Sequence, residues 1–129
     1  MSGRFLPPDH SRGDANTIGG YAAVHARPAA FEGSDGMSYS VEIVVDETEM
    51  VGRPYGAYLL FLRWRRMGTQ GIEGHLETDY LAYGPTEGAA REAIGRLELS
   101  AVKQMLDDLI REQAAARPAR RWWDAMRDE

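Results

Sequence analysis

Four polar side chains alternate along one segment in the second half of the chain: Glu73, His75, Glu77 and Asp79. In an extended strand, residues two apart point to the same face, so this row would present one imidazole beside three carboxylates. Such a set could hold a divalent metal, because imidazole suits a transition metal and carboxylates suit a harder ion. The same groups could supply the acid and base of a small enzyme or the polar wall of a ligand-binding domain.

A structural role also accounts for this row. Arg63 and Arg65 belong to the preceding predicted strand, and Arg63 is expected directly opposite Glu77. Cross-strand charge pairs stabilise a sheet by roughly 0.2 to 1 kcal/mol, and an arginine beside a metal site would compete with the ion. The sequence offers no Ser-His-Asp spacing and no glycine-rich phosphate loop. We therefore predict no catalytic residue, metal site or cofactor, and keep an enzyme or ligand-binding domain using the His75, Glu77 and Asp79 face as an alternative.

The composition fits one small domain. The chain has 129 residues, of which 43% are hydrophobic, enough for an ordinary core but too few for two domains. It has no cysteine, which excludes disulfides and thiolate sites and is compatible with a reducing compartment. No leader pattern or apolar run of about 20 residues is present, so no membrane span is expected and the cytoplasm is predicted. Arginine supplies 14 of the 15 basic residues, which we interpret as a bacterial coding bias.

Alternating apolar residues predict an antiparallel meander with strands over 38–46, 56–67 and 72–83. Residues 21–26 could add a short fourth strand. One face would form the core stripe: Tyr39, Val41, Ile43, Val45, Tyr58, Leu60, Leu62, Trp64, Leu76, Tyr80 and Ala82.

The strand pairing follows from keeping these core residues on one face. Val45 is expected opposite Tyr58, which leaves 47–55 as a long exposed loop. Trp64 is expected opposite Leu76, which requires an odd-length loop or a glycine bulge around the Gly-Thr-Gln-Gly segment that follows.

The second face of the meander keeps large apolar side chains among its charges: Val44, Leu59, Phe61, Leu81 and Tyr83. An antiparallel sheet that faces water on that side should not need them. We expect residues 18–31, a second copy or a protein partner to cover them.

After Pro85 the apolar period changes to that of a helix. Thr86 should cap a short helix to about Arg96, and Ser100 should cap a second one; a single helix kinked near 97–100 is the alternative. The inward residues would be Ala90, Ala93, Ile94, Leu97, Val102, Met105, Leu106, Leu109 and Ile110. The fold class is therefore α+β, with a three- to four-stranded antiparallel meander covered on one face by one kinked or two C-terminal helices.

The chain divides into a flexible N-terminal arm (1–17), a single α+β domain (18–116) and a C-terminal tail (117–129). Pro118 should prevent the second helix from continuing into the tail. The tail carries the remaining candidate interaction residues: Arg120, Arg121, Trp122, Trp123 and Met126. Because Trp and Arg often carry interface energy, we expect both tryptophans to be buried, against the domain or in a partner.

Nucleic-acid binding is less favoured, because residues 31–83 hold four arginines against nine acids. The segment Gly84-Pro85-Thr86-Glu87-Gly88-Ala89-Ala90, after three strands, resembles the strand-to-helix junction of HicB-type antitoxins. The proline-rich third-strand signature of that family has no equivalent here, so the resemblance implies only an alternative, an antitoxin-like or nucleic-acid-binding regulator.

These features favour a non-catalytic protein–protein interaction module, an accessory subunit or small adaptor of a larger bacterial assembly. Its partner would be another protein or a second copy of the chain.

Overall fold

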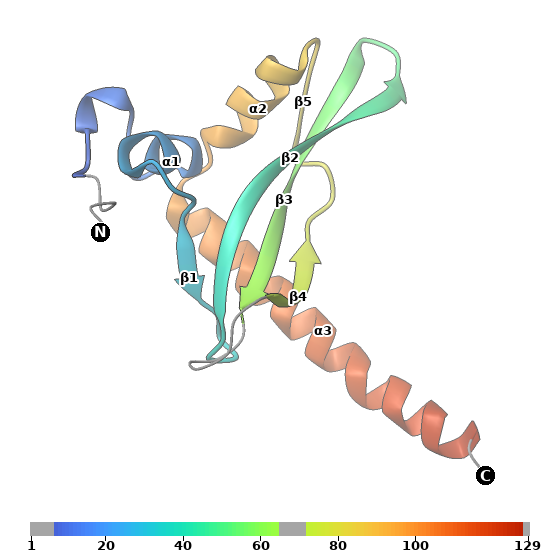
Figure 1. Ribbon diagram of the computed structural model, residues 1–129. Coiled ribbons are helices and arrows are strands. Elements are labelled where there is room, and N and C mark those ends of the chain that lie inside the picture. Colours follow the sequence, from blue (N-terminus) through green and yellow to red (C-terminus); the bar gives the residue numbers. More distant parts are fainter. Residues whose placement is uncertain (1–6, 65–71, 128–129) are drawn as a thin grey trace.

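A computed structural model describes the backbone of residues 7–64 and 72–127, and side chains as far as residue 116 (Figure 1). Its elements are α1 (Ile18–His25), β1 (Ala30–Glu32), β2 (Ser38–Met50), β3 (Arg53–Trp64), β4 (Ile72–Glu77), β5 (Ala82–Gly84), α2 (Glu87–Gly95) and α3 (Leu99–Arg127), preceded by a 3-10 turn at His10–Arg12. The predicted α+β class is confirmed.

The sheet is antiparallel and follows the order β1-β2-β3-β4, with β5 also paired to β3. Because β2 occupies one edge of β3, β4 and β5 lie one after the other along its opposite edge. They form one interrupted edge strand.

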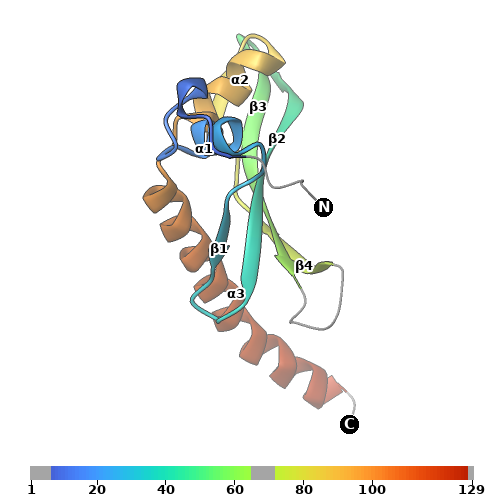
Figure 2. The ribbon, with the colours of Figure 1, turned by 60° about the vertical axis from the view of Figure 1, so that its left-hand side comes forward.

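All three α-helices pack on the same face of this sheet, so the domain has two layers (Figures 1 and 2). The core between the layers is formed by Ile18, Ala29, Tyr39, Val41, Ala57, Leu59, Phe61, Ala90, Ile94, Val102, Leu106 and Ile110. No described helix or strand covers the opposite face.

The two predicted C-terminal helices are present. Thr86 caps α2 as expected, since its hydroxyl accepts a hydrogen bond of 3.0 Å from the Ala89 N–H. α2 ends at Gly95, within a residue of the prediction, and α3 begins at Leu99. α3 then continues past Pro118 to Arg127, where a break was expected, and its end extends beyond the sheet (Figures 1 and 2). The Ala-rich run before the proline favours the helix, and proline costs it one backbone hydrogen bond without ending it here.

Residues 18–25 are helical, so the predicted strand over 21–26 is wrong; the additional strand is β1. Thr17 caps α1, its hydroxyl accepting a hydrogen bond of 3.0 Å from the Gly20 N–H. Gly20 lies inside this helix. Only glycine fits at this position, because a Cβ would fall 1.9 Å from the Asp14 carbonyl oxygen. The two glycines that seemed to bound a strand therefore serve close packing.

Residues 9–17 were expected to lack structure, yet they are tied to the domain. The Asp9 N–H donates to the Val24 carbonyl at 2.9 Å, and the Asn16 carbonyl accepts from the Leu99 N–H at 2.8 Å. Thr17 also forms a bridge with Glu98. The segment thus joins α1 to the junction between α2 and α3.

The β2–β3 pairing differs from the predicted one by a single residue. Val45 lies opposite Ala57 and Val41 opposite Phe61, because the long loop expected at 47–55 is a continued hairpin that turns at Val51 and Gly52. Gly52 has φ of +79°, a left-handed value that glycine adopts without strain. A register shift between Glu47 and Met50 adds one residue to β2. Since side chains alternate with period two, one residue inverts the face of every β3 side chain.

The β3–β4 pairing changes in the same sense. Phe61, not Trp64, lies opposite Leu76. The register shifts where Arg63 faces Gly74 and Trp64 faces Ile72; the loop predicted to hold a glycine bulge lies outside the described residues. Leu59 and Phe61 are consequently core residues, fully buried, and the predicted core residues Tyr58, Leu60, Leu62 and Trp64 lie on the opposite face.

Candidate functional site

The surface of the sheet opposite the helices, called the outer face, keeps an apolar stripe along β3. Its apolar members are Val44, Tyr58, Leu60, Leu62, Trp64, Tyr80 and Tyr83. Trp64 and Tyr80 are 39% and 38% exposed, and the others are half-buried. The Trp64 indole is fixed by a hydrogen bond of 2.9 Å from Nε1 to the Ser40 Oγ. The outer face therefore carries large side chains that the core does not use.

Acidic side chains flank this stripe. Glu42 and Glu77 lie on either side of Leu60, and Asp46 lies beside Gly56. His75 is the neighbour of Leu62. All four share the face of the apolar stripe, since paired residues point to the same side.

Arg63 is not opposite Glu77, so the predicted charge pair is wrong. The inverted register turns Arg63 to the core side, where its Nη1 lies 3.8 Å from Asp35 Oδ2 and 3.3 Å from the Tyr39 hydroxyl. Tyr39 donates to Asp35 at 2.7 Å. Burial, then this hydrogen bond, raises the pKa of Tyr39 to about 12. This group anchors the end of the sheet instead of forming an open site.

His75 and Glu77 share the outer face, while Asp79 follows the end of β4. Among the side chains that the structure describes, no group of three or more His, Cys, Asp or Glu residues is placed to hold a metal ion.

Glu77 and Asp79 instead help to line a pocket of about 370 Å³ at one end of the outer face. Its walls are Asp46, Tyr58, Glu77, Thr78, Asp79, Tyr80 and Tyr83. The Tyr80 ring stands between the other two, with centroids 6.0 Å from Tyr58 and 5.7 Å from Tyr83. We call this the tyrosine pocket. It brings together aromatic and acidic side chains from β2, β3, β4, β5 and the segment between β4 and β5.

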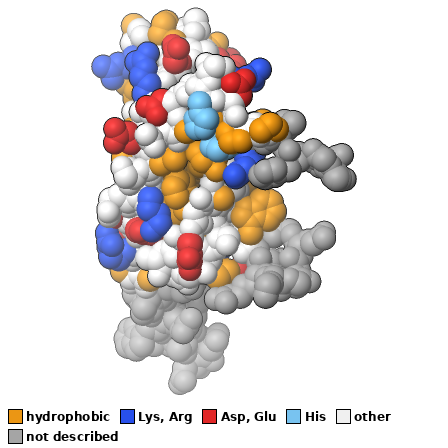
Figure 3. Space-filling view, turned by 90° about the vertical axis from the view of Figure 1, so that its left-hand side faces the viewer, with side chains coloured by type: hydrophobic (Ala, Val, Ile, Leu, Met, Phe, Trp, Pro, Cys, Tyr) orange, Lys and Arg blue, Asp and Glu red, His pale blue; other side chains and the backbone are white. Residues whose placement is uncertain are grey.

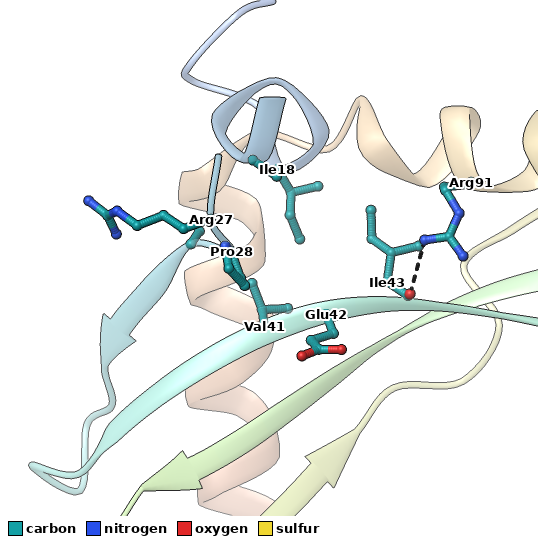
Figure 4. Close-up of a pocket in the computed structure, with 9 residues that line it drawn as sticks. Ile18, Arg27, Pro28, Val41, Glu42, Ile43 and Arg91 are labelled. Atoms are coloured by element: carbon teal, nitrogen blue, oxygen red, sulfur yellow. Dashed lines mark hydrogen bonds between the residues drawn. The ribbon is translucent and has the colours of Figure 1, made fainter. Parts of the chain in front are cut away.

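A second pocket, of about 380 Å³, lies between α1 and β2 (Figure 4). Its polar residues do not converge: Arg27 points away from it, and Glu42 projects to the other side of β2 from Ile43. Arg91 spans from α2 to the Ile43 carbonyl at 3.3 Å. We therefore interpret this pocket as a gap in the packing between α1 and β2.

The side of the molecule that carries α1 and β1 has a mixed surface. In Figure 3 apolar side chains form a broken band among acidic and basic ones.

The predicted interaction residues lie in different parts of the structure. Val44 and Tyr83 lie on the outer face, and Leu81 is 40% exposed between β4 and β5. Leu59 and Phe61 are removed from this surface, because α2 and α3 bury them. Arg120, Arg121, Trp122, Trp123 and Met126 belong to the helical backbone of α3, with side chains outside the described set.

Sequence reasoning missed Tyr58, Leu60, Leu62 and Trp64 as surface residues. β3 is apolar on both faces, so alternation alone does not choose between them. A usable signal was Ala57, a small residue that leaves room for a helix and is fully buried.

The chain matches no protein-family model, no curated protein and no solved structure. None of the described helices is long and apolar enough to cross a membrane.

Proposed function

We propose that the chain is a non-catalytic protein–protein interaction module, an accessory subunit or small adaptor that docks through the outer face. The observation that carries this proposal is the apolar stripe along β3, which no described element covers while the other sheet face holds a complete core. Contiguous apolar surface of this kind is typical of interaction sites in soluble proteins.

The composition of the stripe supports the same proposal. Tyr and Trp are enriched in protein interfaces, and acidic residues beside them can form a polar rim that orients a partner. The lack of cysteine supports a reducing, cytoplasmic setting, and the arginine bias supports a bacterial one.

The decisive experiment compares two outward-pointing substitutions of the same chemistry. Leu62→Asp places a charge in the stripe, and Val51→Asp places it at the tip of the β2–β3 hairpin, where Val51 is fully exposed. Sedimentation would report self-association. Affinity capture at low salt, followed by reconstitution from purified components, would report a protein partner.

We expect Leu62→Asp to abolish the association and Val51→Asp to leave it unchanged. Trp64→Ala, at a more exposed position, tests the same surface if Leu62→Asp lowers the thermal stability. Association that persists in both outer-face variants would contradict the proposal.

A further inference from the structure

The tyrosine pocket depends on an interruption of the edge strand. β4 ends with Glu77 opposite Leu60, and β5 begins with Ala82 opposite Ala57, so two residues of β3 face the four residues 78–81. The Thr78 N–H bonds the Leu59 carbonyl at 3.0 Å and the Leu81 N–H bonds the Ala57 carbonyl at 2.8 Å. The residues between them, Asp79 and Tyr80, are thus displaced from the edge.

Gly56 provides the space into which the Tyr80 ring folds. A Cβ at Gly56 would lie 2.8 Å from Tyr80 Cδ1, closer than any ordinary contact. The Tyr80 hydroxyl then donates to Asp46 Oδ2 at 3.1 Å, across β3 from the edge strand. Both ends of the Tyr80 side chain are therefore held on the outer face.

The three rings of the tyrosine pocket are inclined to one another and do not stack in parallel; they form an aromatic corner. Tyr58 and Tyr80 are inclined by 67°, and Tyr80 and Tyr83 by 56°. Inclined ring faces surround a rounded, tetrahedral group, whereas a planar guanidinium stacks best against parallel rings. The face of an aromatic ring is negative, so such a corner attracts a cation.

The acidic side chains around the three rings also favour the binding of a cation. Asp46, Glu77 and Asp79 line the pocket, and its described lining includes no Lys or Arg. The pKa values of Tyr58 and Tyr80 are raised, first by burial and then by the neighbouring carboxylate Asp46, so these phenols are neutral at physiological pH. At the rim, the Arg53 guanidinium already lies over the Tyr83 ring, 5.6 Å from its centroid.

We infer that the tyrosine pocket binds an alkylammonium group, presented by a lysine side chain of the protein partner, with or without methylation. The three rings would contact the ammonium group and the carbon atoms bonded to its nitrogen. The carboxylates of Asp46, Glu77 and Asp79 would neutralise the positive charge of this group. This inference rests on the proposed function, since it assigns the chemistry of the residue that docks at one end of the outer face.

A titration with small probes tests the pocket without any partner. Choline and its neutral isostere 3,3-dimethyl-1-butanol have the same shape and differ in charge, and methylguanidinium carries the charge on a planar group. Tyrosine ring resonances in NMR spectra report binding. A free alkylammonium probe should bind with a dissociation constant on the order of millimolar, shifting Tyr58, Tyr80 and Tyr83, with the neutral isostere and the guanidinium at least about tenfold weaker.

Two substitutions of Tyr80 separate its ring from its hydroxyl. Tyr80→Ala should weaken choline binding by about tenfold, whereas Tyr80→Phe should retain most of it. Tyr80 is partly exposed, so both variants should fold, and the backbone resonances check this.

Two further probes identify the preferred ammonium group: lysine amide acetylated on its α-amino nitrogen, and the same compound trimethylated on Nζ. Equal binding of the neutral isostere, or the absence of a saturable tyrosine shift with every ammonium probe, would overturn the inference while leaving the outer-face experiment untouched. Conversely, choline binding in a chain whose association survives Leu62→Asp would contradict the proposed function alone.

Discussion

The group formed by Asp35, Tyr39 and Arg63 illustrates how a one-residue register change alters residue roles. In the predicted register Arg63 would face solvent beside Glu77; in the structure its side chain is 17% exposed and its Nε is buried without a hydrogen-bond partner among the described residues. Tyr39 is fully buried and joins both charged side chains. The group thus couples the β1–β2 turn to the end of β3.

The titration of Tyr39 gives a prediction at alkaline pH. Its pKa is raised from 10 to about 12, so the folded state holds this proton when the unfolded state has lost it. The stabilisation is complete below pH 10 and is lost as pH rises through about 12. Tyr39→Phe, which lacks this proton, should be less stable by about 1 kcal/mol at neutral pH because Asp35 loses its hydrogen bond.

Denaturant unfolding of both proteins at several pH values tests this. The free-energy difference between the wild type and Tyr39→Phe should shrink from pH 10 toward pH 12. Tyr21→Phe, which changes a tyrosine of α1 outside this group, serves as control. A difference that stays constant over this range would contradict the assignment to Tyr39.

At the scale of the elements, the edge strand and Gly56 build the tyrosine pocket together. Gly56→Ala places a Cβ 2.8 Å from Tyr80 Cδ1 and 3.1 Å from Thr48 Cγ2. The Tyr80 ring can swing outward because it is partly exposed, so we expect a loss of stability of about 1 kcal/mol and the loss of contacts between Tyr58 and Tyr80.

Nuclear Overhauser effects between the two rings measure the displacement. Gly88→Ala in α2 is the matched control, since a Cβ there meets nothing within 4 Å. It should raise stability by up to about 1 kcal/mol through helix propensity and leave the rings in place. Unchanged ring contacts in Gly56→Ala would show that Gly56 does not determine the position of Tyr80.

The elements that could be predicted are those with a single apolar face and a clear cap. Helix α2 has both, and α3 has the apolar face, although it begins at Leu99, so Ser100 lies inside the helix and does not cap it as predicted. The inward residues Ile94, Val102 and Leu106 are fully buried as expected. β3 has apolar residues on both faces, so its register depended on the hairpin, and one extra residue between Glu47 and Met50 decided it. That residue could not be located from alternation, because Glu47–Met50 is polar except at its end.

The same ambiguity explains what was found and missed at the candidate site. A second apolar sheet face could be predicted because the strands have more large apolar residues than one face can use. The members of that face could not, since a register shift exchanges Leu59 and Phe61 for Tyr58, Leu60 and Leu62. The pocket depends on Tyr80 leaving the edge strand, which no local pattern indicated.

For the whole molecule, the arrangement is asymmetric: three helices cover one sheet face, and the end of α3 continues beyond the sheet (Figure 2). Residues 117–127 contain four arginines, two tryptophans and one acid, whereas the outer face is flanked by acidic side chains. The helical backbone carries this segment away from the domain instead of turning it back. Of the two roles predicted for the tryptophans, docking on a partner therefore fits the backbone better than folding back.

Replacing both Trp122 and Trp123 with Ala distinguishes these roles. If the tryptophans dock on a partner, the variant should keep the thermal stability of the isolated chain but lose partner retention by about tenfold or more, since buried tryptophans are frequent hot spots of binding energy. Replacing Arg120 and Arg121 with Gln should mainly slow association, because rim charges act on the encounter rate. Thermal unfolding and binding kinetics measure the two effects separately. A lower melting temperature in the tryptophan variant would indicate that the segment packs on its own domain, and unchanged stability with unchanged retention would remove α3's C-terminal end from the interaction surface.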